Sequence, residues 1–259
     1  MALITFTSDF GEEDHYVAAV KAGMLKTNPG AQIIDVSHYI HPFDIAHGAF
    51  VLKSVFTNFP EATIHLVAVN TVYDPAPRYI AIQLADHFFV GPDNGILSLV
   101  SEKEPARLVE IDPAGFETTT FPARDILGVA AARLSAGADI NDLGKPTDDY
   151  TRLLGRQLKA TKKLIVGNVI RVDHYGNLIS NIEQEIFGII HKGRPFIIKF
   201  GKEVSSRIHA YYTSVEPGEC FVIFNSLGLM EIGINKGNAS ELLGLGYDSP
   251  VMIQFEEQL

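Results

Sequence analysis

Cysteine and positive charge are both scarce in this sequence. The chain of 259 residues contains one cysteine, Cys220, so no disulfide can form within it. The apolar neighbours of Cys220 in GECFVIF are typical of a reduced, buried thiol in a cytosolic protein. With 21 Lys+Arg against 31 Asp+Glu the formal net charge is -10. A protein with this balance lacks the concentrated positive field needed to bind nucleic acid or an anionic membrane. We therefore expect a small-molecule or protein partner.

Long apolar runs are absent as well. No apolar stretch approaches the roughly 20 residues that a transmembrane helix needs. The first residues, MALITFTSDFG, reach acidic side chains before the apolar region of a secretory signal develops. These absences predict a soluble, cytoplasmic protein without a membrane partner. The 46% of hydrophobic residues is nevertheless enough for a substantial core.

Strand-like and helix-like segments alternate in the first half of the chain. ALITFTS, QIIDVSH and TIHLVAV have the composition of strands, and RYIAIQLA and HFFVGPDNG extend the series. Apolar residues recur at helical spacing in YVAAVKAGMLKTN, in DIAHGAFVLKSVFTNF, where Asp44 is the expected N-cap, and in ARDILGVAAARLSAG. This order predicts an α/β domain over residues 1–150 with a mostly parallel sheet.

The pattern changes in the second half. A polar segment runs from about residue 140 to residue 163, and we place a linker within it at 151–163. Short strand-like runs follow, bounded by Gly, Pro, Asn or Asp: LIVGNVIRV, NLISNI, PFIIKF, CFVIF, LMEIGI and VMIQF. They predict an all-β domain over 164–259, an antiparallel barrel or sandwich.

Four acidic residues follow the first predicted strand in SDFGEED: Asp9, Glu12, Glu13 and Asp14. Ligands of open parallel sheets bind at this end of the strands. Carboxylates there would repel a phosphate, but they suit a metal, another cation or a pair of vicinal hydroxyls. The alternative is that they cap the following helix and complement its dipole.

Two further segments carry polar side chains. SHYIHPFDIAH offers His38, His41 and His47, but their spacing is not that of a familiar zinc motif and no second cluster completes four ligands, so we predict no metal site. VDHYGNLISN places Asp173 and Asn177 around a Tyr-Gly turn, which is either a hairpin turn alone or a pair of ligand-binding side chains.

Four blocks of the sequence, in order, resemble one family. They are TSDFGEEDHYVAAVKAGMLKTNPGAQIIDVSHYIHPFDIAHGAFVL, FFVGPDNGILSLV, VDHYGNLISNIE and NSLGLMEIGINKGNASELLGL. Together they are similar to the S-adenosylmethionine (SAM) hydroxide adenosyltransferases, which also include fluorinating and chlorinating enzymes. The resemblance extends from about Thr5 to Leu245. It implies an α/β domain joined to a β domain, a homotrimer with sites between subunits, and SAM as substrate without a further cofactor.

The resemblance also implies roles for individual residues. Asp14 or Asp9 would hold the ribose hydroxyls, and Asp173 would meet the α-ammonium of methionine. Asn177 would contact the heterocycle or the amino acid, and Tyr212 would stack on adenine. The remaining implied contacts to adenine and methionine come from Ser226, Asn235, Asn238 and Ala239.

The reaction implied is displacement at the ribose C5′ by water, with methionine leaving from the sulfonium to give adenosine. The family's water-handling Asp, Arg and His are not retained here. Asn70 stands at the Asp position, Arg78 lies one residue beyond the Arg position, and Pro122 replaces the His. We name Asn70 and Arg78 as the catalytic candidates. Three functions stay open: slow SAM hydrolysis, adenosyl transfer to a halide, and binding of SAM or adenosine without catalysis.

Overall fold

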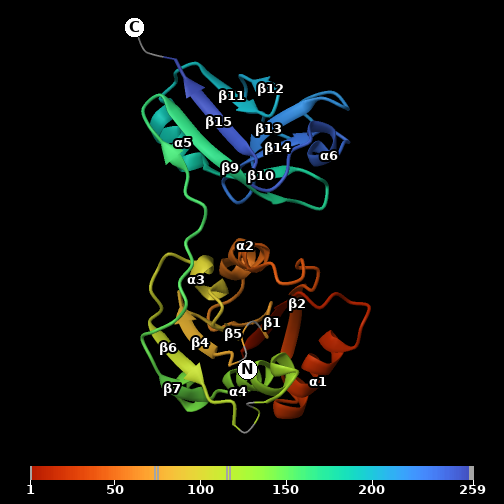
Figure 1. Cartoon of the computed structure of the whole chain (residues 1–259), viewed down its shortest axis with the longest axis vertical. Helices are drawn as coiled ribbons and strands as arrows, with labels where there is room; N and C mark the ends of the chain where they lie inside the picture. The colour runs from red at the N-terminus through yellow and green to blue at the C-terminus, as the bar shows by residue number, and fades with distance from the viewer. Residues whose placement is uncertain (1, 73, 75, 115, 117, 257–259) are drawn as a thin grey trace. The chain divides into compact units, whose positions relative to one another are not determined.

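The computed structural model describes residues 2–72, 74, 76–114, 116 and 118–256. The chain divides into two compact units, Met1–Leu154 and Gly155–Leu259 (Figure 1). The order of helices and strands within each unit decides which loops carry its candidate functional side chains.

The first unit contains a seven-stranded sheet in the order β2-β1-β3-β5-β4-β6-β7. Its strands are β1 (Leu3–Ser8), β2 (Gln32–Ser37), β3 (Ile64–Ala68), β4 (Tyr79–Leu84), β5 (His87–Pro92), β6 (Arg107–Ile111) and β7 (Gly144–Pro146). The β1–β2, β1–β3 and β3–β5 pairs are parallel. The β4–β5, β4–β6 and β6–β7 pairs are antiparallel. The sheet is therefore partly parallel, where the sequence predicted a mostly parallel one.

The turn between β4 and β5 explains the difference. Only Ala85 and Asp86 connect these strands, with φ of 48° and 63°. Positive φ at both central residues is typical of a two-residue hairpin turn, and a parallel connection needs a crossover of a dozen or more residues. The short turn therefore makes this pair antiparallel.

Helices cover both faces of this sheet (Figure 1). One core lies under α1 (Tyr16–Thr27) and α4 (Gly128–Ser135), which η2 (Ala123–Leu127) precedes. The other lies under α2 (Ile45–Val55) and α3 (Ile96–Val100). Strand β3 is buried on both faces, since Leu66 enters the first core and Val67 the second. The predicted cap of α2 is confirmed, because the Asp44 side chain accepts the His47 N–H at 2.9 Å.

Part of the polar segment after residue 140 belongs to this unit. Ile140–Leu143 forms the short helix η3, and β7 follows it directly. Farther along, the Thr151 N–H donates to Asp93 Oδ1 at 2.7 Å, next to α3. Backbone hydrogen bonds thus hold the chain to the first unit well into the segment that composition alone marks as a linker.

The second unit is built on an antiparallel, barrel-like sheet in the order β12-β11-β15-β9-β10-β14-β13, with β8 pairing β9. The strands are β8 (Lys159–Ala160), β9 (Leu164–Val172), β10 (Leu178–Glu183), β11 (Phe196–Phe200), β12 (Glu203–Ser205), β13 (Cys220–Phe224), β14 (Leu229–Ile234) and β15 (Pro250–Phe255). Alternate residues of β14, such as Met230 and Ile232, point into its core. The residues between them face the other side of the sheet.

Two short helices make this unit less purely β than predicted. These are α5 (Gln184–His191) and α6 (Ala239–Leu243). Ile186, Phe187 and Ile190 of α5 pack against the core, at the spacing of one helix face. The prediction of an all-β domain was wrong on this point, because helices of 8 and 5 residues are too short for a helical period to stand out in the sequence.

Candidate binding site

Asp9 fixes the loop that follows β1. Its Oδ2 accepts backbone hydrogen bonds from Phe43 and Asn70, each at 3.0 Å. Phe43 precedes α2 and Asn70 follows β3, so one carboxylate ties three loops together at the carboxyl ends of parallel strands. The Gly11 N–H also donates to His38 O at 2.8 Å. Gly11 has φ of +67°, a conformation that favours glycine.

The other three acidic residues of this loop are exposed: Glu12, Glu13 and Asp14. Capping of α1 by them is not observed. The N-cap of α1 is His15, which makes no side-chain capping bond, and no acidic residue lies in the first turn. Glu12 accepts a hydrogen bond from the Tyr39 hydroxyl at 3.0 Å. Capping of α1 is therefore wrong for these three residues, and Asp14 is exposed in the loop between β1 and α1.

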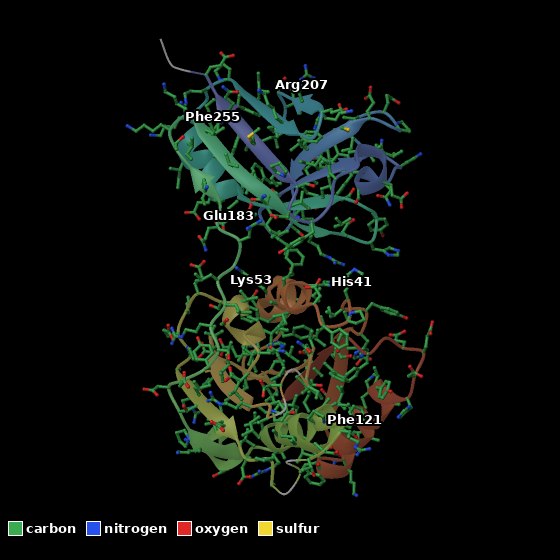
Figure 2. All side chains as sticks on the ribbon, in the orientation of Figure 1. His41, Lys53, Phe121, Glu183, Arg207 and Phe255 are labelled. Atoms are coloured by element: carbon green, nitrogen blue, oxygen red, sulfur yellow. The ribbon has the colours of Figure 1, made fainter. Side chains whose placement is uncertain are left out.

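Three aromatic rings connect this loop to the TFPARD segment. Phe10 and Tyr16 lie 6.0 Å and 5.6 Å from Phe121, measured between ring centroids. Phe121 is labelled in Figure 2, in the first unit. Pro122 and Ala123, directly after it, are buried. The rings bring the loop after β1 next to the residues around Pro122, although the two segments are about a hundred residues apart in the sequence.

Asn70 is held by its backbone. Its N–H donates to Asp9, and its carbonyl accepts from Asn94 Nδ2 at 3.1 Å. Asn94 Nδ2 also donates to Val69 O at 3.0 Å. With φ of 50°, Asn70 is in the left-handed region, which Asn tolerates better than most residues. The structure places Asn70 beside Asp9 but tests no catalytic role for it.

Arg78 lies among carboxylates. Its guanidinium is 3.3 Å from Asp93, 3.2 Å from Glu110 and 3.4 Å from Asp149. Asp93 is 2% exposed. Burial raises the pKa of Asp93, although the hydrogen bonds from Thr151 and the charge of Arg78 oppose that shift. A cation beside this buried acid is needed for its ionised form, so Arg78 has a structural task whatever its role in catalysis.

The histidines near this loop make contacts within the protein. His38 is 2% exposed, and its Nδ1 lies 2.7 Å from Ser8 Oγ. The His41 N–H donates to His47 Nδ1 at 3.1 Å. In the part of the chain that the structure describes, no group of three or more His, Cys, Asp or Glu side chains is arranged to hold a metal ion.

In the second unit, Asp173 and Asn177 close the turn between β9 and β10. Asp173 Oδ1 accepts the N–H groups of Tyr175 at 2.9 Å and Asn177 at 2.8 Å. Asp173 Oδ2 accepts from Asn177 Nδ2 at 3.2 Å. Gly176 has φ of +81°, and a Cβ there would lie 2.0 Å from Asn238 Oδ1. The hairpin turn of the sequence analysis is confirmed, and the close packing of Gly176 on Asn238 joins it to α6.

A cavity of about 640 Å³ opens beside this turn. Five predicted binding residues line it: Asp173, Asn177, Tyr212, Asn235 and Asn238. The remaining lining residues were not predicted: Tyr175, Phe221, Ile234, Lys236 and Gly237. Residues from three separate parts of the second unit thus meet at one concave, partly aromatic surface, which is the usual form of a small-molecule site.

Two other predicted residues do not line this cavity. Ala239 is fully buried in the core at the start of α6. Ser226 is exposed in the turn between β13 and β14. Neither position excludes a backbone contact, and their roles stay predictions.

The asparagines of the cavity are fixed by bonds to the protein. Asn238 caps α6, since its Oδ1 accepts the Glu241 N–H at 3.1 Å. Asn235 Nδ2 donates to Val215 O at 2.7 Å. The Tyr212 ring packs edge-on against the Phe221 ring, with 5.3 Å between the ring centroids. Tyr212 is 48% exposed. The cavity is therefore preformed and has an exposed aromatic ring at its rim.

The sequence analysis missed Glu231, a buried carboxylate on β14. Glu231 is 3% exposed, and its Oε2 accepts from Asn225 Nδ2 at 2.9 Å. Burial raises its pKa, and the hydrogen bond from Asn225 opposes that shift only in part. The side chains of Tyr212 and Asn177 face the same carboxylate. The signal lay in LMEIGI, where Glu231 alternates with the core residues Met230 and Ile232.

Of the helices that the structure describes, none is long and apolar enough to cross a membrane.

Two family models match most of the chain. Residues 4–144 match the SAM hydroxide adenosyltransferase N-terminal domain, and residues 167–252 match the C-terminal domain of the same family. The chain is 32% identical over 250 residues to an (R)-S-adenosyl-L-methionine hydrolase of Salinispora tropica, covering 93% of this chain and 94% of that protein.

More distant relatives have another name. A fluorinase of Actinoplanes sp. is 26% identical over 215 residues, covering 70% of this chain and 72% of its own. Among solved structures, an uncharacterized conserved protein from Thermotoga maritima matches with a TM-score of 0.89 and 29% identity, covering 97% of this chain and 100% of that one.

Proposed function

We propose that this chain, which belongs to the SAM hydroxide adenosyltransferase family, binds SAM and cleaves it at the ribose C5′ to adenosine and methionine. One observation carries the proposal. A single cavity in the second unit gathers Asp173, Asn177, Tyr212, Asn235 and Asn238, the side chains expected to hold the nucleoside and the amino acid. The similarity to a named SAM hydrolase over nearly the whole chain supports the same reaction.

The chemistry of the cavity suits this substrate. SAM carries a sulfonium and an ammonium group, and the carboxylate of Asp173 attracts such cations. The exposed ring of Tyr212 offers a flat apolar surface for adenine. Asn177 presents its Oδ1 as an acceptor for a donor group of the ligand, because its Nδ2 donates to Asp173. We assign binding roles on these grounds to the five residues, with Ser226 and Ala239 as further contacts.

We propose that Asp14 binds the ribose hydroxyls. Asp9 Oδ2 already accepts two backbone N–H groups, whereas Asp14 is exposed. An ionised carboxylate can accept hydrogen bonds from both hydroxyls of a vicinal diol. Asp9 then acts indirectly, by fixing the loop that carries Asp14.

The reaction is a nucleophilic substitution. The C5′–S bond breaks and its electron pair stays on sulfur, so methionine leaves as a neutral thioether and needs no general acid. Water forms the new C5′–O bond and loses one proton to solvent. Asn70 cannot act as a general base, and a missing base typically costs a factor of ~10²–10⁴ in rate. We therefore propose slow hydrolysis, driven by orientation and desolvation of water in a closed site.

A halide is the second candidate nucleophile. The buried, apolar Pro122 and Ala123 suit a weakly hydrated anion better than they suit an activated water, and a fluorinase is among the relatives. Binding without turnover is the third outcome to test.

We further propose a cytoplasmic homotrimer whose complete sites form between subunits, as the family resemblance implies. Light scattering after size-exclusion chromatography distinguishes a trimer from a monomer. No cofactor besides the substrate enters this proposal.

The decisive experiment incubates the protein with SAM, with and without chloride, in water enriched in oxygen-18, and separates the products by chromatography and mass spectrometry. Adenosine carrying oxygen-18 supports hydrolysis at C5′, whereas 5′-chloroadenosine supports the halide. Tight binding without product leaves only a binding protein. If the protein neither binds nor consumes SAM or adenosine, the proposed function fails.

A further inference from the structure

Glu231 occupies an unusual place for a carboxylate. It lies in the middle of β14, opposite Ile179 of β10 and Ile223 of β13, and only 3% of it is exposed. The groups that act on its pKa besides burial are Asn225, Asp173, Tyr212 and Asn177, of which the charged one is another acid. Burying such a group costs free energy, so its position calls for a compensating role.

The partners of Glu231 suggest that role. Asn225 Nδ2 donates to Oε2, which leaves Oε1 buried and without a hydrogen bond of normal geometry to any described residue. The hydroxyl of Tyr212 and the amide of Asn177 both face this carboxylate. Both belong to residues that line the cavity, Tyr212 in the segment before β13 and Asn177 just before β10.

The face of β14 that carries Glu231 also packs against residues that line the cavity. Glu231 and Gly233 lie on the same face, since side chains alternate along a strand. A Cβ at Gly233 would lie 2.1 Å from the Phe221 ring and 2.4 Å from Asn177 Oδ1. The missing side chain lets these two lining residues close over the strand, with Glu231 two positions away on the same surface.

We propose that Glu231 is a positioning residue, which orients the Tyr212 ring and the Asn177 amide for binding of the nucleoside. With Asn177 Nδ2 directed to Asp173 and Glu231, its Oδ1 remains as the acceptor for a donor of the ligand. With the Tyr212 hydroxyl directed to Glu231, the ring has a fixed plane on which a purine stacks. This inference rests on the proposed function of the cavity, because it names the residue that organises it.

The test compares Glu231→Gln with Glu185→Gln, an exposed glutamate on α5 of the same unit. Glutamine keeps the size of the side chain but loses the anionic acceptor. Isothermal titration with adenosine and with SAM is expected to give about tenfold weaker binding of both by E231Q, since hydrogen bonds to charged groups contribute more than neutral ones. E185Q is expected to bind like the unaltered protein.

A double-mutant cycle separates positioning from general weakening. Tyr212→Phe keeps the ring and removes the hydroxyl. If Glu231 acts through that hydroxyl, the E231Q/Y212F double variant binds adenosine no more than about twofold weaker than E231Q alone, whereas independent effects multiply. Multiplying losses, or an E231Q affinity equal to that of the unaltered protein, would overturn the inference and leave the proposed function standing.

Two further measurements keep the inference testable. If E231Q does not fold, Y212F alone must weaken adenosine binding severalfold, and an unchanged affinity rejects the link. If the unaltered protein binds neither adenosine nor SAM, the proposed function fails, and hydrogen exchange decides instead. Faster exchange of the peptide that contains Tyr212 in E231Q than in E185Q supports positioning, and equal exchange refutes it.

Discussion

The carboxylate of Asp9 accepts a hydrogen bond from the backbone N–H of Asn70 at 3.0 Å. Asp9 thus fixes Asn70, which stands at the position where the family resemblance implies a catalytic Asp. The same oxygen accepts the Phe43 N–H. A loop held in this way is ordered before a ligand binds, which lowers the conformational-entropy cost of binding. In the proposed function Asp9 and Asp14 have separable roles, since Asp9 fixes the loop and the exposed Asp14 is proposed to contact the substrate.

This separation can be measured with two alanine variants. Asp9→Ala removes the acceptor for two backbone donors and is expected to lower the free energy of unfolding by about 2 kcal/mol, since hydrogen bonds to charged groups contribute roughly 1.5–3 kcal/mol. Asp14→Ala is expected to leave stability within about 0.5 kcal/mol and to weaken adenosine binding about tenfold. Urea denaturation and calorimetric titration check the pair. Equal effects of both variants on stability would contradict the division.

A buried histidine pair predicts acid sensitivity of the first unit. Thr5 Oγ1 lies 2.7 Å from His65 Nδ1, and His65 Nε2 lies 3.2 Å from His87 Nδ1. Burial, with the neighbouring His87, lowers the pKa of His65 to about 3 from 6.5. The unfolded chain therefore binds a proton at this residue below about pH 6.5, while the folded chain does not until about pH 3.

The sign of the effect follows from that difference. The contribution of His65 is fully present above about pH 6.5 and is lost as the pH falls toward 3, at up to about 1.4 kcal/mol per pH unit. Unfolding free energies measured across this range for the unaltered protein and for His65→Gln test it. The slope of the variant should be smaller, and identical slopes would show that His65 does not carry the dependence.

The sequence predicted the local features of this protein better than the long-range ones. The Asp44 cap and the turn from Asp173 to Asn177 depend on neighbours a few residues apart, and both are observed. The antiparallel β4–β5 pair was missed because Ala85 and Asp86 lack the Asn-Gly or Asp-Gly signature of a two-residue turn.

The candidate site shows the same limit. A family resemblance identified Tyr212 and Asn238, and the structure brings them to one cavity. The sequence analysis did not identify Glu231, because an acid that alternates with core residues in a strand is expected to face solvent. The contacts with Tyr212 and Asn177 join different segments of the chain, and the alternation in LMEIGI alone does not report them.

Arg78 and Asp93 predict a stability effect that is independent of catalysis. Arg78→Met leaves the buried Asp93 without its cation and is expected to cost about 2 kcal/mol, less than the roughly 3–5 kcal/mol of a fully buried pair because 34% of the Arg78 side chain is exposed. Asp149→Asn, with 83% of the side chain exposed, is expected to change stability by less than about 0.5 kcal/mol.

The double variant R78M/D93N provides the control for this prediction. Neutralising Asp93 removes the uncompensated charge, so the double variant should be more stable than R78M alone. Thermal unfolding of the unaltered protein, R78M, D149N and R78M/D93N measures these differences in stability. A double variant less stable than R78M would mean that Arg78 stabilises the fold by another route.

Gly176 and Gly218 form a matched pair for testing the cavity wall. Both have positive φ, +81° and +91°, so alanine strains the backbone at either position. Only at Gly176 would the new Cβ meet another group, Asn238 Oδ1 at 2.0 Å, whereas Gly218 has nothing within 4 Å. Gly176→Ala is therefore expected to weaken adenosine binding at least tenfold, while Gly218→Ala binds normally. Calorimetric titration decides, and equal affinities would separate the turn from the ligand site.

Asn70→Asp tests whether the missing acid limits the reaction. Aspartate has the shape of asparagine and also tolerates the left-handed conformation found at position 70, where φ is 50°. The new carboxylate could accept a proton from the attacking water, and we expect about a tenfold increase in adenosine formation from SAM, short of the ~10²–10⁴ of a complete general base because Pro122 remains. Asn58→Asp, on an exposed residue, adds the same charge away from the site and should leave the rate unchanged. If N70D forms adenosine no faster than N58D, then positioning and desolvation of the substrate, rather than proton transfer at this residue, set the rate of this protein.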